Sequence, residues 1–161
     1  MDVTTMPTTD SLLSKLIRRY PHLSFREGED FFWSPGENTV YYTTNNSLFN
    51  ARLLHEVSHA ELGHTSYTRD IELIAIEREA WKYAKTTLAP LFDLTIESSI
   101  IEDDLDTYRD WLHARSTCPN CQHSGVQTDN KQYTCVVCRN SWSVNTATTC
   151  GLKRYKQNTP L

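Results

Sequence analysis

Four of the five cysteines form two Cys-x-x-Cys pairs, and this pattern constrains the fold more than any other feature of the sequence. The pairs are Cys118 with Cys121 and Cys135 with Cys138, and 13 residues lie between them. Thiolates two residues apart on a tight turn can share one ion, and the intervening residues then form a hairpin. The pattern predicts a zinc ribbon at residues 113–145, held by a structural zinc ion. Few apolar residues accompany the cysteines, so we expect this unit to fold only with its metal.

Charge divides the chain at the same place. Residues 1–112 contain 10 Lys and Arg against 19 Asp and Glu, whereas residues 113–161 contain 6 against 1. Such a split indicates two units with different partners. Basic and aromatic side chains of the ribbon and tail are candidates for nucleic-acid contact: Lys131, Tyr133, Arg139, Trp142, Lys153, Arg154, Tyr155 and Lys156. The alternative is that Tyr133 and Trp142 only pack the small hairpin.

No apolar run approaches the length of a membrane span, so no membrane association is expected. Residues 1–10 are polar and lack the pattern of a signal peptide. We therefore expect a cytoplasmic protein, in which cysteines bind metal rather than form disulfides. His123 and the fifth cysteine, Cys150, are possible substitute ligands, and we expect neither to bind.

A second motif, His55-Glu56-Val57-Ser58-His59, lies in a predicted amphipathic helix over residues 47–62 that Gly63 ends. Two histidines four residues apart project from one face of a helix and can hold one metal ion. Glu56 stands beside them, where a carboxylate can accept a proton from a water activated by zinc. The motif predicts a catalytic zinc site of a metallopeptidase, with His55 and His59 as ligands and Glu56 as the catalytic base.

Such a site needs a third protein ligand. His64 follows the helix end too closely to approach the metal from another direction. The next predicted helix, residues 70–88, offers Glu72, Glu77 and Glu79. Glu77 falls within the apolar arc of this helix, where a carboxylate is costly unless it binds something, and Glu79 lies at the border of that arc. The residues alone leave the choice open.

The segments 55–64, 77–84 and 88–90 together resemble the ImmA/IrrE family of metallopeptidases. That family typically has a HELGH-type helix, followed by an E-A-N-x-F-A helix that ends in L-M-P. The resemblance covers about residues 12–112 and implies a zincin-like peptidase domain at residues 1–112, with Glu79, directly before Ala80, as the third zinc ligand. The sequence departs from the family pattern at four positions: Ser58 for Gly, Trp81 for Asn or Asp, Tyr83 for Phe, and Ala89 for Met.

The remaining pattern predicts an α+β fold. A helix is expected at residues 11–20, a hairpin from strands 31–33 and 39–43, and a long helix from residue 95 to 112. The acidic run at residues 102–104 is expected to be a solvated face of that helix. Residues 146–161 lack an apolar pattern and are expected to form a basic, flexible tail.

The resemblance implies a regulatory endopeptidase that cleaves a protein partner, such as a helix-turn-helix repressor. The substrate would add a strand to the edge of the hairpin, and His64, Tyr67 and Tyr83 are candidates to stabilise the oxyanion. With the ribbon, the chain would bind two zinc ions, one catalytic and one structural.

Two other classes of protein remain as alternatives. An SprT-like protease acting at DNA also combines HExxH with a zinc ribbon, but it needs a third histidine downstream. Here only His113 and His123 are available. A non-catalytic adaptor that binds DNA or protein is the other alternative, and the intact Glu56 argues against it.

Overall fold

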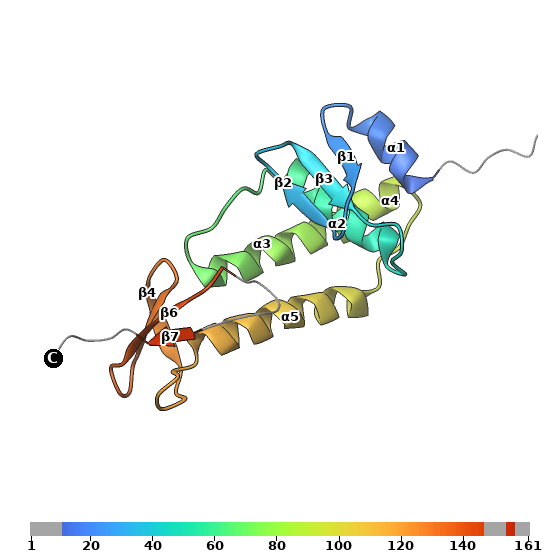
Figure 1. Cartoon of the computed structure of the whole chain (residues 1–161). Coiled ribbons are helices and arrows are strands. Elements are labelled where there is room, and N and C mark those ends of the chain that lie inside the picture. Colours follow the sequence, from blue (N-terminus) through green and yellow to red (C-terminus); the bar gives the residue numbers. More distant parts are fainter. Residues whose placement is uncertain (1–10, 147–153, 157–161) are drawn as a thin grey trace, which may run out of the picture. The chain divides into compact units, whose positions relative to one another are not determined.

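The computed structural model describes residues 11–146 and 154–156, which divide into two compact units (Figure 1). The first unit comprises Met1–His64 and Tyr83–Thr95, and the second comprises Thr65–Lys82 and Ile96–Leu161. Helices and a small sheet occur in each unit, so the fold is α+β as predicted. Two helical segments that precede residue 112 group with the cysteine-bearing sheet in this division.

The sheet of the first unit has the strand order β1-β3-β2, with bounds β1 Ser24–Glu27, β2 Phe32–Ser34 and β3 Thr39–Tyr42. Strands β2 and β3 form the predicted antiparallel hairpin. Strand β1 was not predicted, and it pairs in parallel with β3. It has only four residues and largely exposed side chains, so no apolar alternation marks it in the sequence. Helix α1, Leu12–Arg19, precedes this sheet and lies within the predicted range.

Helix α2, Phe49–Glu61, packs against β2 and β3 and carries the His-Glu-x-x-His segment. The helix begins two residues after the predicted start at Ser47, and Asn46 Oδ1 accepts a hydrogen bond of 2.8 Å from the Leu48 backbone N–H instead. Gly63, with a φ of 69°, ends the helix as predicted. Leu53, Leu54 and Val57 are fully buried on its inner side, so the helix is fixed by apolar packing.

A π-helical turn replaces the last part of the predicted helix 70–88. Helix α3, Asp70–Tyr83, leads into the π-helix η1, Ala84–Leu88, and the short helix α4, Ala89–Leu91, follows. Ala84, Leu88 and Ala89 are buried, and η1 packs against α2. The small side chain at position 84 permits this close approach.

In the second unit, α3 and the long helix α5, Ser98–Ser116, are tied together at both ends. Near one end the Trp81 indole N–H donates to Asp104 Oδ2 at 2.7 Å, and near the other Arg115 binds Asp70. Trp81 therefore takes part in this helix pairing. Among the described helices, none is long and apolar enough to cross a membrane.

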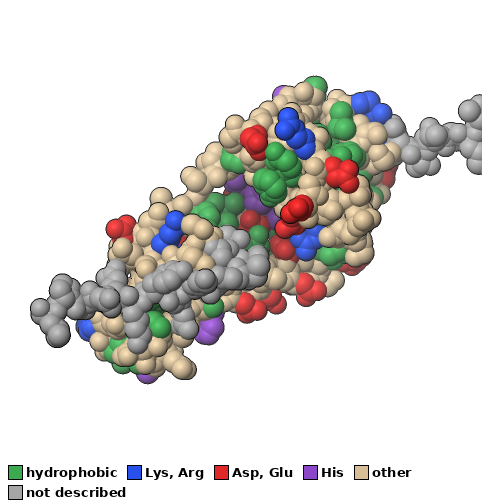
Figure 2. Space-filling view, viewed as in Figure 1, with side chains coloured by type: hydrophobic (Ala, Val, Ile, Leu, Met, Phe, Trp, Pro, Cys, Tyr) green, Lys and Arg blue, Asp and Glu red, His purple; other side chains and the backbone are tan. Residues whose placement is uncertain are grey.

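The exposed face of α5 is acidic, as the red side chains over this helix in Figure 2 show. Glu102 and Asp103 are exposed, as expected for a solvated face. Asp104 is half-buried because it accepts the hydrogen bond from Trp81, so the prediction fails at that residue. Arg109 Nη1 lies 3.1 Å from Glu102 Oε2 and 2.7 Å from Asp106 Oδ1, which partly offsets the local negative charge.

The second sheet has the order β4-β5-β6-β7, with bounds β4 Gly125–Asp129, β5 Gln132–Cys135, β6 Ser141–Val144 and β7 Arg154–Lys156. We call this sheet, with the two Cys-x-x-Cys turns that precede and follow β4 and β5, the four-cysteine sheet. Strand β7 pairs antiparallel with β6, although its three residues lie in the range expected to be a flexible tail. The predicted ribbon therefore gains a strand that residues 113–145 do not contain. Cys150 and Lys153 lie outside the described residues.

Candidate metal centres

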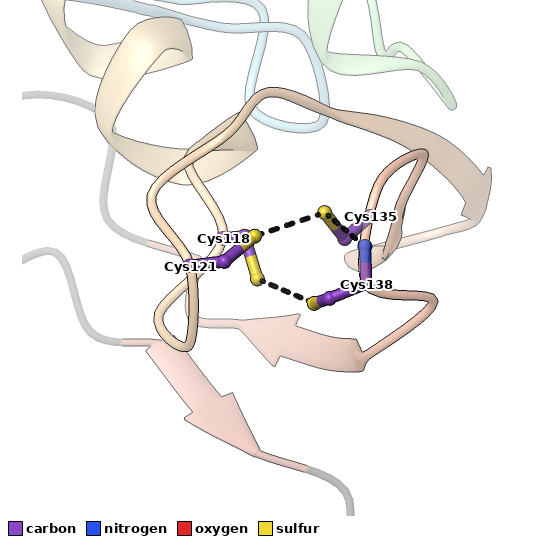
Figure 3. Close-up of side chains that lie close together, drawn as sticks. All are labelled: Cys118, Cys121, Cys135 and Cys138. Atoms are coloured by element: carbon purple, nitrogen blue, oxygen red, sulfur yellow. Dashed lines mark hydrogen bonds between the residues drawn. The ribbon is translucent and has the colours of Figure 1, made fainter.

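The four predicted cysteines converge at one point, where their side chains face one another (Figure 3). Cys118 Sγ lies 3.7 Å from Cys138 Sγ, and Cys121 Sγ lies 3.5 Å from Cys135 Sγ. Four sulfurs around a tetrahedral zinc ion at about 2.3 Å would be separated by about 3.8 Å. The observed spacing therefore fits a single four-coordinate ion, and His123 is exposed outside this group.

The two turns that carry the cysteines are built alike. In the first, Cys118 N–H donates to the carbonyl of His123 at 2.8 Å, and in the second Cys135 N–H donates to the carbonyl of Asn140 at 2.8 Å. Each turn ends on a residue with positive φ, Gln122 at 64° and Arg139 at 65°. This left-handed residue reverses the chain directly after the second cysteine of each pair, so both thiols of a pair face the same way.

Backbone N–H groups point at the first cysteine of each pair. Asn120 N lies 3.4 Å from Cys118 Sγ, and both Val137 N and Cys138 N lie 3.4 Å from Cys135 Sγ. Burial disfavours the Cys118 thiolate, but these and neighbouring hydrogen bonds lower its pKa to about 6. Backbone hydrogen bonds also lower the pKa of Cys135. The turns thus favour the deprotonated sulfur at the first cysteine of each pair, as a metal ligand requires. At Cys121 a backbone hydrogen bond to His123 lowers the pKa, but burial and hydrogen bonds with the other thiols outweigh it and raise the pKa.

The two histidines of α2 lie side by side in the first unit. Their ring centroids are 4.6 Å apart, and His55 and His59 are 4% and 7% exposed. Glu56 is also buried, and its Oε1 lies 3.5 Å from His55 Nδ1. A helix that buries two imidazoles and a carboxylate in consecutive turns needs a compensating interaction, because buried polar groups are costly otherwise.

His64 supports His59 directly. Nδ1 of His64 lies 2.9 Å from Nδ1 of His59, and the His64 N–H donates to the His59 carbonyl at 3.0 Å. The His64 carbonyl in turn accepts a hydrogen bond of 3.0 Å from the indole N–H of Trp33 on β2. A hydrogen bond at Nδ1 leaves Nε2 of His59 as the nitrogen for a metal ion. His64 is therefore an orienting group beside His59. The contribution of Trp33 was not predicted, because no local pattern links it to His64, 31 positions further on.

Glu77 joins the two histidines in a group that could hold a metal ion. One ligand atom from each of His55, His59 and Glu77 lies within 4.8 Å of the others, and all three residues are buried. This result favours Glu77 over the predicted Glu79. Residues two apart on a helix point to nearly opposite sides, so only one of the two can belong to the buried face.

The other two candidate ligands have different environments. Glu79 is exposed, whereas the buried face of α3 contains Leu73, Ile74, Glu77, Ala80 and Trp81. Glu72 is exposed as well, and its Oε2 accepts hydrogen bonds from the backbone N–H groups of Thr68 at 3.1 Å and Arg69 at 3.2 Å. These bonds lower the pKa of Glu72. Glu72 thus caps the start of α3.

The remaining candidates are the two tyrosines considered for the oxyanion and the two histidines considered as a third ligand. Tyr67 and Tyr83 are both half-buried, and burial raises the pKa of Tyr67. His113 and His123 are exposed, and neither belongs to the group of His55, His59 and Glu77. The third histidine that an SprT-like site requires therefore has no counterpart in the part of the chain that the structure describes.

The aromatic residues of the four-cysteine sheet are packed inside it. Tyr133 is 2% exposed and Trp142 is fully buried, and their rings stack with centroids 5.7 Å apart. They form a small core with Cys118, Cys135 and Val144. These two rings are therefore not available to stack on bases, which leaves the alternative that they pack the hairpin.

Comparisons with models of known protein families, with curated proteins and with solved structures found no match to this chain. The chemistry of the two groups of side chains therefore carries the functional argument. Four thiolates are the typical donor set of a structural zinc ion, and two imidazoles with one carboxylate are typical of a catalytic one.

Proposed function

We propose that the protein is a zinc-dependent endopeptidase in which His55, His59 and Glu77 bind the catalytic ion and Glu56 is the general base. The grouping of two histidines and a glutamate, with Glu56 next to His55, is the observation that carries the proposal. Three protein ligands leave a fourth position for water, which is the arrangement of catalytic rather than structural zinc sites. The fold of the catalytic part is proposed to be zincin-like, with α2 as the active-site helix.

A zinc ion at this site would supply a Lewis acid and would lower the pKa of a bound water to about 7. Glu56 would accept the proton of the attacking water and pass it to the leaving amine. Its neighbour His55 keeps the carboxylate oriented, and the low exposure of both residues excludes bulk water from the proton transfer. His64 would hold the ring of His59 in the orientation for binding through Nε2.

Strand β2 supports a role in holding an extended peptide. Among the described residues it pairs only with β3, so its outer edge can accept a further strand. Trp33 ties this strand to His64 and hence to the histidine pair. Phe32, on the other face of the strand, is 47% exposed and stacks on Tyr41 with centroids 4.4 Å apart, which stiffens the edge. A substrate added to β2 would be an extended protein segment.

The second zinc ion would be structural, bound by the four cysteines. The partner proposed for the enzyme is a protein, such as a DNA-binding repressor of the helix-turn-helix class, because members of the family that the sequence resembles commonly act on such repressors. Lys131 and Arg139 of the sheet are half-buried and exposed, respectively, and could contribute to a contact with nucleic acid. The proposed peptidase activity does not depend on that contact.

Replacing Glu56 tests the proposal. Glu56→Gln should abolish cleavage of an unstructured protein such as casein while the protein keeps its zinc, because the residue acts on water and is not a ligand. The measurement combines zinc content by elemental analysis with peptide release followed by mass spectrometry. Glu61→Gln is the matched control, since Glu61 is the last residue of the same helix and does not belong to the His-His-Glu group.

The outcomes separate the classes of function. Cleavage by the wild type and by Glu61→Gln, but not by Glu56→Gln, supports the endopeptidase. Equal cleavage by all three would show that Glu56 is not the base. If none of them cleaves casein or a library of extended peptides and the His-His-Glu site still binds zinc, the adaptor is the better interpretation.

A further inference from the structure

A buried ion pair connects the start of α3 to the end of α5. Asp70 and Arg115 are each 2% exposed, and Arg115 Nε lies 2.6 Å from Asp70 Oδ2. A second bond of 3.3 Å joins Arg115 Nη2 to Asp70 Oδ1. The two groups therefore meet side-on, with both carboxylate oxygens bound by one guanidinium. A buried pair with this geometry is sensitive to the loss of either partner, because the other charge remains buried.

The four-cysteine sheet supplies the other partners of Asp70. The hydroxyl of Tyr133 on β5 donates to Asp70 Oδ2. Gln127 on β4 accepts a hydrogen bond of 2.8 Å from the Asp70 backbone N–H, and its amide N–H donates to the Thr68 carbonyl at 3.3 Å. Two strands of the sheet thus hold the first residue of α3, by its side chain and by its backbone.

Arg115 is fixed by the same sheet. Its Nη1 donates to the carbonyl of Asn145 at 2.6 Å, and its own carbonyl accepts a hydrogen bond of 2.8 Å from the indole N–H of Trp142. The guanidinium also lies over the ring of Trp111, 4.7 Å from its centroid. The contacts of Arg115 described above thus come from α5 itself and from Trp142 and Asn145, which lie on β6 and directly after it.

The cysteines and this network share one small core. Cys118, Cys135, Tyr133, Trp142 and Val144 pack together, and Tyr133 and Cys135 are two positions apart on β5. A unit with so small an apolar core takes much of its stability from its metal. Loss of the ion would release β5, and with it the hydroxyl that binds Asp70.

Helix α3 carries this anchoring toward Glu77. Asp70 and Glu77 are seven residues apart, about two helical turns, so they lie on the same face and roughly 10 Å apart along the axis. Both are buried. Fixing the first turn of a helix fixes the axial and rotational position of a residue two turns further on, because the hydrogen-bonded backbone between them is stiff.

We propose that Asp70 is a positioning residue through which the four-cysteine metal site sets the place of Glu77, the third ligand of the catalytic site. This inference rests on the proposed function. The two metal sites are then coupled: an intact four-cysteine sheet holds α3 in the register in which Glu77 binds the ion. Without that anchor, His55 and His59 are left to bind the ion as a pair, which is a weak site.

Metal affinity of the full-length protein, measured by competition with a chromophoric zinc chelator, tests this coupling. Tyr133→Phe removes the hydroxyl that binds Asp70 but keeps the ring that stacks on Trp142. Asp70→Asn keeps the shape of the side chain and removes its charge. Both variants should bind the catalytic zinc about 10- to 100-fold more weakly, as is typical when a group that orients a ligand is lost. The cysteine-bound zinc should stay in place.

Thr134→Val is the matched control. Thr134 is the next residue on β5, and its hydroxyl pairs with Ser141 at 3.0 Å, not with Asp70. Melting temperatures of all variants separate positioning from general stabilisation. If Tyr133→Phe and Asp70→Asn lower the melting temperature but bind the catalytic zinc as tightly as Thr134→Val does, the network is only structural and the inference is overturned. Should Asp70→Asn fail to fold, the comparison of Tyr133→Phe with Thr134→Val decides.

The variant His55→Ala separates a failure of this inference from a failure of the proposed function. If His55→Ala binds as many zinc ions as the wild type does, the assignment of His55 to a catalytic zinc site is wrong. If His55→Ala removes the site and Tyr133→Phe leaves its affinity unchanged, only the coupling fails.

Discussion

The two groups of candidate ligands span almost the same length of chain but differ in how they are encoded. Cys118 and Cys138 are 20 positions apart, and His55 and Glu77 are 22 apart. All four thiols lie in two short turns whose backbone geometry is repeated, and the sequence spacing alone identifies them. The third member of the His-His-Glu group depends on which face of α3 is buried. Sequence distance therefore does not limit the prediction of a metal ligand. The limit is that the ligand on α3 depends on how that helix is rotated about its axis.

The groups also differ in their support. Backbone N–H groups hold the sulfurs of Cys118 and Cys135. A side chain, His64, holds His59. Backbone support comes with the turn and survives most substitutions, whereas side-chain support can be removed by one. We therefore expect that loss of one cysteine abolishes metal binding at the four-cysteine site altogether. In the histidine site, we expect single substitutions to lower the metal affinity by degrees.

The largest effect is expected from Cys118→Ser. Cys118 is fully buried and carries one of the two thiolates at the centre of the small core, so its loss should release the ion and unfold the four-cysteine sheet. At saturating zinc, elemental analysis should find a fall from about two equivalents to about one. Cys150→Ser is the control and should keep both. Two equivalents in Cys118→Ser would mean that these cysteines do not form a zinc site.

The second-largest effect compares Glu77→Gln with Glu79→Gln. Removal of a true ligand should weaken the catalytic zinc by more than the roughly 10–100-fold typical of losing an outer partner. Glu77→Gln should show that loss, and Glu79→Gln should bind zinc as the wild type does because Glu79 is exposed. The reverse result would identify Glu79 as the ligand, as the family resemblance implies. Chelator competition measures both variants.

The contrast between these two glutamates shows what sequence reasoning can reach. Spacing identified His55, His59 and the four cysteines, because each pair is set by one turn or one helix. Two considerations competed for the third ligand: the cost of a carboxylate in the apolar arc favoured Glu77, and the family resemblance favoured Glu79. The buried position of Glu77, 6% exposed, and its grouping with the two histidines agree with the first consideration.

Other features had no signal in a single sequence. Strand β1 is short and polar, and it forms only because β3 offers an edge for parallel pairing. Asp70 is the first residue of the predicted helix 70–88, and its sequence neighbours do not reveal that its carboxylate pairs with Arg115, 45 positions further on. Such pairings depend on the tertiary fold, which the local pattern does not encode. The helices and the hairpin were predicted because their apolar periodicity is local.

A smaller effect is expected from Gly125→Ala, which tests whether packing as well as metal holds the four-cysteine sheet. A Cβ at position 125 would lie 2.4 Å from Trp142 Cη2 and 2.8 Å from the Thr134 carbonyl oxygen. Trp142 cannot easily move, since its indole N–H is bound to Arg115. We expect a loss of about 1–3 kcal/mol in unfolding free energy, typical of overpacking, with the zinc retained.

Chemical denaturation with both zinc sites saturated measures this loss. Gly36→Ala is the control, because nothing lies within 4 Å of its added Cβ. Equal stability of the two variants would mean that Trp142 can rearrange and that the metal, rather than the packing, sets the stability of the sheet.

The smallest effect is expected from His64→Phe, and it tests the difference in support between the two sites. The phenyl ring keeps much of the volume of imidazole but cannot hydrogen-bond to Nδ1 of His59, which lies 2.9 Å from His64 Nδ1. His59 would then rotate more freely, and the catalytic zinc should bind about tenfold more weakly, the lower end of the range for lost orienting groups. His22→Phe is the control, because that side chain is 63% exposed in the same unit. The four-cysteine zinc should be unaffected in both variants. If His64→Phe binds the catalytic zinc as tightly as His22→Phe, then His59 is held by the packing of α2 alone, and the histidine site is as insensitive to single side chains as the cysteine turns are.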